Sequence, residues 1–137
     1  MSIKDDIAAE RAAIEAAPAV EVPTRMNGKE HPVTIRRLNP AEWGDLAAKH
    51  PPRPRSTDTA LGYNEGTLPG RYPVTHITVD GEPIDAETWL DFYTALKSTY
   101  RAAIATAIWG ENVYPAIKEI EDLGKAMAGK SSDSPAA

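Results

Sequence analysis

Hydrophobic and polar positions follow two different periods along this chain. Within residues 20–38, two segments (20–25 and 31–38) alternate apolar and polar side chains, which is the period of a half-buried strand. From residue 86 onwards the apolar residues recur every three or four positions, as in an amphipathic helix. The two periods predict an α+β fold that is mainly α-helical, with a small N-terminal β-hairpin and a C-terminal pair of helices.

Turn and cap residues predict where these elements begin and end. Asn27-Gly28 favours a type I′ turn in the middle of residues 20–38, because both residues tolerate positive φ. Asn39 followed by Pro40 is typical of a helix start, since Asn caps the first turn and Pro fits its first position. The pair Pro51-Pro52 prevents that helix from continuing beyond residue 50.

These signals predict one domain over residues 19–129, with a helix before it and a disordered polar tail over 130–137. We expect Gly110 to end the first long helix and Gly129 to end the second. The predicted order is a helix over 1–18, a hairpin over 19–38, a helix over 40–50, an irregular loop with a short strand over 51–84, and helices over 86–109 and 115–128.

The first and last predicted helices differ in how firmly their apolar residues should hold them. In the first, Ile3, Ile7 and Ile14 form a thin stripe filled out by alanine, so this helix is expected to fray unless it docks on something. The last helix has a fuller apolar face that we expect to point inside. Its members are Ile117, Ile120, Leu123 and Met127.

Composition and charge exclude several classes of protein. The 137 residues include no cysteine, which excludes disulfides, thiolate zinc sites and cysteine nucleophiles. Lys and Arg number 15 against 20 Asp and Glu, and a net charge of -5 argues against a general nucleic-acid binder. No segment reaches the about 18 consecutive apolar residues of a membrane span, and the N-terminus is acidic where a signal peptide is apolar. We therefore expect a cytoplasmic protein with no membrane partner.

Motifs for catalysis or cofactor binding do not occur. The three histidines lack metal-ligand spacing, and there is no HExxH, GxSxG, GxGxxG or phosphate-binding loop. Paired carboxylates fall on predicted caps or exposed faces. The sequence therefore predicts no catalytic residues, no metal, no cofactor and no enzymatic activity.

Two segments could instead contact a partner. The basic residues of 49–55 are separated by prolines, which makes the segment stiff and extended; this favours an acidic protein partner over nucleic acid, and a merely solvated loop stays open. Trp89, Phe92, Tyr93 and Tyr100 share one predicted helix. Most of these aromatic residues are expected in the core. However, Trp89, Phe92, Tyr93 and Leu96 span a wider arc than one neighbour would cover, which indicates packing against a partner subunit or client.

The run VTIRRLNPAEWGDLAAKHPPRP, followed by DTALGYNEGTLP, resembles the small tail assembly chaperones of long-tailed bacteriophages, especially those that infect actinobacteria. The motifs are a strand, a short helix centred on Trp43, the stop His50-Pro51-Pro52 and the loop Gly62-Tyr63-Asn64. The resemblance covers roughly residues 30–125. It departs from the family at RYPVTHITVDGEP, where many relatives continue into helix, and at the helix before Ala17.

The resemblance implies a non-enzymatic protein that binds the tape-measure protein, keeps it soluble and assists tail-tube assembly. It implies action in the host cytoplasm and absence from the mature virion, and it leaves open contacts with the major tail protein and self-association. A small tail or head–tail connector protein retained in the virion is the alternative, and a nucleic-acid-binding adaptor is a second. The candidate partner-binding residues are Trp43, Pro51, Pro52, Arg53, Tyr63, Asn64, Trp89, Tyr93 and Tyr100.

Overall fold

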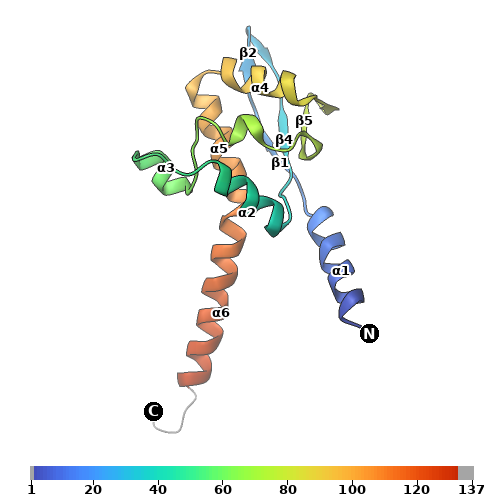
Figure 1. Ribbon diagram of the computed structural model, residues 1–137, viewed down its shortest axis with the longest axis vertical. Coiled ribbons are helices and arrows are strands. Elements are labelled where there is room, and N and C mark those ends of the chain that lie inside the picture. The colour runs from blue at the N-terminus through green and yellow to red at the C-terminus, as the bar shows by residue number, and fades with distance from the viewer. Residues whose placement is uncertain (1, 133–137) are drawn as a thin grey trace.

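A computed structural model describes residues 2–132 (Figure 1). The helices are α1 (Ile3–Glu15), α2 (Pro40–Lys49), α3 (Ser56–Leu61), α4 (Ala86–Ala95), α5 (Ser98–Asn112) and α6 (Tyr114–Ser132). The strands are β1 (Val20–Val22), β2 (Arg25–Met26), β3 (Lys29–Glu30), β4 (Val33–Ile35), β5 (Ile77–Val79) and β6 (Glu82–Pro83). With 59% helix and a small antiparallel sheet, the predicted α+β, mainly α-helical class is confirmed.

The N-terminal hairpin forms as predicted and supplies one half of a four-stranded antiparallel sheet of order β1-β4-β5-β6, in which β1 is an edge strand. At its tip, β2 and β3 are joined by Asn27 and Gly28, with φ of 54° and 74° as a type I′ turn requires. The strand expected in the long loop is β5, and it does join the hairpin, with Ile77 opposite Ile35. The segment before it, Val74–His76, is a 3-10 turn.

The long loop over 51–84 contains more structure than its sequence predicts. Helix α3 and two 3-10 turns, η1 (Pro69–Arg71) and η2 (Val74–His76), lie between α2 and β5. Helix α3 ends at Gly62, whose φ is 84°. A six-residue helix is too short to show a periodic apolar pattern, so periodicity does not predict α3.

The predicted single helix over 86–109 is wrong, because the chain bends between α4 and α5. Leu96 and Lys97 are extended, with ψ of 148° and 149°, and redirect the chain. As a result α4 packs on η1, while α5 packs on β1 and β4. No glycine or proline marks the bend, and Leu96 itself is buried in the core. Two different packing partners, rather than local propensity, break this helix.

The expected ends of the two C-terminal helices also move. Gly110 lies inside α5, which continues to Asn112, and Gly129 lies inside α6, which continues to Ser132. Residues 130–132 of the predicted disordered tail therefore belong to α6, and residues 133–137 lie outside the described residues.

The core lies between the inner face of the sheet and helices α4 and α5. Val33 and Ile35 of β4 are fully buried, as are Ile104 and Ile108 of α5. Helices α1 and α6 do not belong to this body. Both extend from it toward the same end of the molecule, with α2 between their bases (Figure 1).

Candidate partner-binding groove

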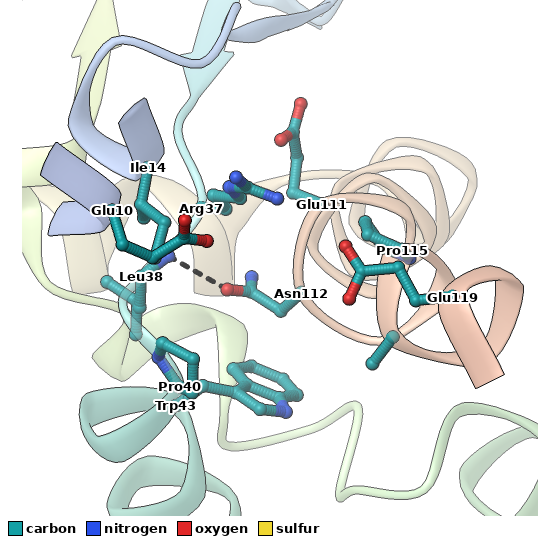
Figure 2. A pocket seen from close by; sticks show the side chains of 11 residues that line it. Glu10, Ile14, Arg37, Leu38, Pro40, Trp43, Glu111, Asn112, Pro115 and Glu119 are labelled. Atoms are coloured by element: carbon teal, nitrogen blue, oxygen red, sulfur yellow. Dashed lines mark hydrogen bonds between the residues drawn. The ribbon is translucent and has the colours of Figure 1, made fainter. Parts of the chain in front are cut away.

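A cavity of about 210 Å³ opens where the bases of α1, α2, α5 and α6 meet (Figure 2). We call this cavity, together with the exposed apolar faces of α1 and α6 that continue it, the α1–α6 groove. The cavity is lined by Glu10 and Ile14 of α1, Arg37 and Leu38 of the linker before α2, Pro40 and Trp43 of α2, Glu111 and Asn112 of α5, and Pro115, Ala116 and Glu119 of α6.

Asn112 fixes the floor of the groove. Its Oδ1 accepts a hydrogen bond from the backbone N–H of Leu38 at 2.8 Å, which ties the end of α5 to the linker before α2. Its Nδ2 donates to the hydroxyl of Tyr72 at 2.9 Å. That hydroxyl in turn donates to the carbonyl of Arg36 at 2.6 Å. The floor is therefore held by a chain of hydrogen bonds rather than by one contact.

Helix α1 forms one wall of the groove. Ile14 and Glu10 line the cavity, and Ile7 and Ile3 lie two helical turns before them on the same side of the helix. Ile3 is 72% exposed and Ile7 is 44% exposed. A capping box at Ser2 and Asp5 starts the helix, but none of its residues is buried within the described part of the chain. That α1 needs a docking partner stays a prediction.

Helix α6 forms the other wall. Ala116 and Glu119 line the cavity, and Leu123 follows them on the same side of the helix. The prediction that the apolar face of this helix points inside is wrong. Ile117, Ile120, Leu123 and Met127 are 41%, 70%, 62% and 63% exposed. The amphipathic pattern was real, but within the described residues nothing covers its apolar side.

The cavity is acidic. Glu10, Glu111 and Glu119 line it, and among its described lining residues Arg37 is the single cation. Burial raises the pKa of Glu111, and the charge of Arg37 partly offsets this. The Nε of Arg37 is buried and has no hydrogen-bond partner among the described residues. A buried donor without a partner costs about 1–3 kcal/mol, so polar groups here are not fully satisfied by the chain itself.

Trp43 is the candidate residue that the structure places in this groove. Its ring packs edge-on against Tyr63, with ring centroids 5.5 Å apart and an interplanar angle of 83°. Trp43 is half-buried and lines the cavity, so one side of the indole remains available to an occupant. Tyr63 behind it is fully buried.

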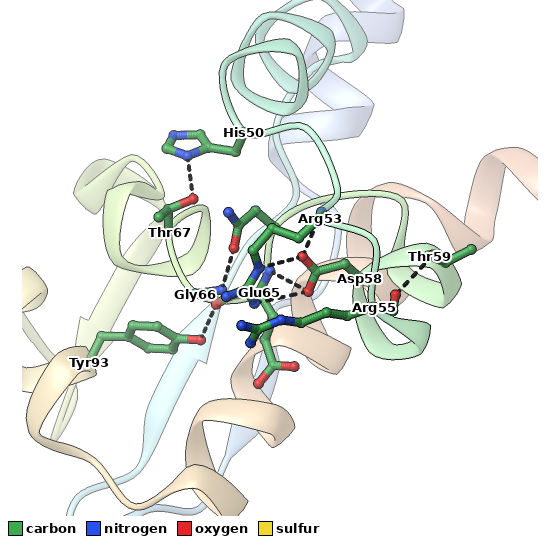
Figure 3. A network of polar contacts seen from close by, with 10 residues as sticks. His50, Arg53, Arg55, Asp58, Thr59, Glu65, Gly66, Thr67 and Tyr93 are labelled. Atoms are coloured by element: carbon green, nitrogen blue, oxygen red, sulfur yellow. Dashed lines mark hydrogen bonds and ion pairs between the residues drawn. The ribbon is translucent and has the colours of Figure 1, made fainter.

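The two loop motifs of the family resemblance form one structural unit (Figure 3). The backbone N–H of Asn64 donates to the carbonyl of His50 at 3.0 Å, and the imidazole Nδ1 of His50 lies 2.8 Å from the hydroxyl of Thr67. The side-chain Oδ1 of Asn64 accepts from the N–H of Gly66 at 2.8 Å. The HPP stop and the GYN loop therefore lie side by side, although residues 53–61 separate them in the sequence.

An ion pair between the buried carboxylate of Asp58 and the partly exposed guanidinium of Arg53 holds the same unit together. Asp58 is fully buried and accepts hydrogen bonds from the Nε of Arg53 at 2.8 Å, from its Nη2 at 3.2 Å and from its backbone N–H at 2.9 Å. A fourth bond comes from the backbone N–H of Glu65 at 3.3 Å. These bonds, chiefly that of the Arg53 side chain, hold the pKa of Asp58 at about 2. Arg53 therefore has a structural role.

A shallow basic concavity lies over this unit. Lys49, His50, Arg53 and Arg71 line it, together with Pro51, Pro52 and Asn64 of the candidate residues. Burial, with the charges of Arg71 and Lys49, lowers the pKa of His50, so its imidazole is neutral at pH 7. No acidic residue lines this concavity, in contrast to the α1–α6 groove.

The remaining aromatic candidates are mostly interior. Tyr63, Trp89 and Tyr93 are at most 1% exposed, and each gives its polar hydrogen to a backbone carbonyl: Tyr63 to Ala105, Trp89 to Pro69 at 2.8 Å, and Tyr93 to Glu65 at 2.8 Å. Burial raises the pKa of both phenols. The wide aromatic arc of α4 is thus covered by the chain's own η1 and loop, and it supports no partner surface. Tyr100 is half-buried beside the β2–β3 hairpin, far along α5 from the groove.

Sequence reasoning missed the acidic groove residues Glu10, Glu111 and Glu119. They come from three helices, and their convergence depends on the tertiary arrangement alone. The apolar stripe of α6 was visible in the sequence, but its exposure was not.

Within residues 2–132 no helix is long and apolar enough to cross a membrane, and no group of three or more His, Asp or Glu side chains is placed to hold a metal ion. Comparison with protein-family models, with curated proteins and with solved structures gave no match.

Proposed function

We propose that this chain is a tail assembly chaperone of a long-tailed bacteriophage that binds the tape-measure protein through the α1–α6 groove. The observation that carries the proposal is the pair of uncovered apolar helix faces, on α1 and α6, that flank one cavity. Exposed apolar faces of this kind mark sites for a partner. A tape-measure protein is long and helical, so its own apolar stripe suits a groove between two helices.

The resemblance in residues 30–125 supports the same proposal. The motifs on which it rests meet in space, where Trp43 contacts Tyr63 and the carbonyl of His50 accepts from Asn64. This unit forms the base from which α2 presents Trp43 to the groove. We therefore propose that the shared motifs maintain the body, while α1 and α6 hold the client.

The groove is short, and the proposed client is long. Many copies bound along one client can keep it soluble by avidity even if each contact is weak. Under the proposal the chain acts in the cytoplasm of the infected cell and is absent from the finished virion. The chain would contact the major tail protein when tail subunits displace the chain from the client.

Co-expression tests the proposal. The tape-measure protein of the phage that encodes this chain is expected to be insoluble alone, to become soluble with the chain and to co-purify with it. If the tape-measure protein stays insoluble, or is soluble without any complex, the proposal is wrong. Mass spectrometry of purified virions tests the alternative that the chain is a tail or connector protein retained in the particle. A chaperone should be missing from the virions, and a structural component should be abundant in them.

The basic concavity is the one observation that favours a nucleic-acid adaptor. Lys49, Arg53 and Arg71 line it without any acidic side chain. Such an adaptor would bind DNA with an affinity that falls steeply as salt rises. Fluorescence anisotropy with a labelled duplex at physiological salt should show no binding if the chaperone proposal is right.

A further inference from the structure

The charge of the α1–α6 groove points to the chemistry of its occupant. Glu10, Glu111 and Glu119 line the cavity from three different helices. Arg37 lies between Glu10 and Glu111, whose carboxylate points away from Trp43 and Glu119 (Figure 2). The carboxylate of Glu111 is partly desolvated and has a single cation nearby to compensate it. An occupant that brought positive charge to this position would relieve that cost, whereas an acidic occupant would increase it.

The apolar walls define the second requirement. Leu123 continues the α6 wall beyond Ala116 and Glu119, and Ile7 continues the α1 wall beyond Ile14. On α6, Lys118 and Lys125 lie roughly half a helical turn away from Ile120 and Leu123, whereas Glu121 lies one turn after Ile117, at the far edge of the apolar face. The groove edge of α6 is therefore apolar and acidic, with its lysines turned away.

We infer that the α1–α6 groove takes an amphipathic helix whose apolar stripe is flanked by lysine or arginine residues. The inference rests on the proposed function for the identity of the client and adds the chemistry of the segment that binds. Charge complementarity selects this occupant over a second copy of the chain. A second copy would place the acidic edges of α1 and α6 against their own equivalents, and like charges in an interface oppose association.

Two designed peptides test the inference on the full chain. Both are 21-residue helices with Leu at heptad positions a and d; one has Lys at e and g, the other Glu at the same positions. Isothermal titration at low salt should show the Lys peptide binding at least tenfold more tightly than the Glu peptide. The difference should shrink at 0.5 M salt, because exposed charges are then screened. Equal affinities, or tighter binding of the Glu peptide, would overturn the inference.

Matched variants locate the effect. Glu10→Gln with Glu119→Gln should remove most of the preference for the Lys peptide. Glu15→Gln with Glu121→Gln removes the same charge from the same two helices, outside the cavity lining, and should leave the preference intact. Circular dichroism checks that both variants fold. If the two pairs behave alike, the groove does not select the charge and the inference is wrong.

Self-association is measured in the same samples. Sedimentation should show a monomer or a dimer that the Lys peptide dissociates. A dimer that persists at saturating Lys peptide and is broken by Ile120→Asp would show a second copy in the groove and overturn the inference. The tape-measure co-expression separates the two claims. If the tape-measure protein forms a soluble complex but the peptides show no charge preference, the proposed function holds and the inference about the groove is wrong. If the peptides show the charge preference but no soluble complex forms, the inference holds and the proposed function is wrong.

Discussion

The side-chain Oδ1 of Asn112 accepts a hydrogen bond from the backbone N–H of Leu38 at 2.8 Å. This contact joins the end of α5 to the start of α2 across 74 positions of sequence. It places Trp43 and the first turn of α6 around one cavity. The groove is therefore a product of the folded body and not of α1 and α6 alone.

Asn112→Ala should lower the free energy of unfolding by about 1–3 kcal/mol, because the buried N–H of Leu38 loses its acceptor. Asn112→Asp keeps an acceptor for Leu38 but loses the Nδ2 donor to Tyr72, so this variant should also be destabilised. Urea unfolding followed by tryptophan fluorescence measures both. Wild-type stability of Asn112→Ala would show that the hydrogen bond does not hold the floor.

Asp58→Asn should destabilise the protein by about 1–3 kcal/mol at pH 7, because the buried carboxylate accepts hydrogen bonds from Arg53 and from the N–H of Glu65 that a neutral amide cannot all replace. Asp91→Asn, at an exposed position of α4, is the control and should change stability by less than about 0.5 kcal/mol. If the two variants unfold at the same urea concentration, the ion pair has no structural role.

The same carboxylate predicts an acid dependence of stability. Its pKa is about 2 in the folded protein and 3.8 in the unfolded chain, so the unfolded state binds the proton first as the pH falls. The stabilisation from Asp58 is present above pH 4 and is lost as the pH falls from about 4 to 2. Urea unfolding at pH 7 and pH 2.5 should therefore show a smaller difference between wild type and Asp58→Asn at the lower pH. A difference that grows on acidification would contradict the assigned pKa.

Trp89→Ala should destabilise the chain by about 3–5 kcal/mol, since a fully buried indole leaves a large cavity. Trp89→Phe keeps most of the volume but leaves the carbonyl of Pro69 without its donor, so it should cost less. Thermal unfolding measures the series. If Trp89→Ala folds with normal stability but fails to bind the tape-measure protein, Trp89 contacts the client and is not a core residue.

Local signals predicted what local interactions determine. The Asn27-Gly28 turn and the Asn39-Pro40 helix start form as expected because each depends on a few neighbouring residues. The bend at Leu96 was missed because it depends on the different surfaces that α4 and α5 cover. Periodicity also identified an apolar face on α6 correctly, but periodicity reports amphipathicity and not whether the chain itself supplies the covering surface.

The candidate site shows the same division. Trp43 was predicted and does line the groove, whereas Trp89 and Tyr93 satisfy the same aromatic pattern and are interior. A sequence pattern cannot separate the two cases, because a core position and a docking position need the same apolar side chain. The sequence does not predict Glu111 as a groove residue, because its place in the groove depends on the charged residues that other helices bring near it.

The central claim is that the exposed face of α6 holds the client, and paired variants of that helix test it most directly. Ile120→Asp with Leu123→Asp places charge on the apolar face, and Lys118→Asp with Lys125→Asp places it on the opposite face of the same helix. The measurement is the soluble fraction of co-expressed tape-measure protein, with urea unfolding to show that both variants fold. We predict that the first pair loses the soluble client at unchanged stability and the second pair keeps it. A soluble client with the first pair would contradict the account.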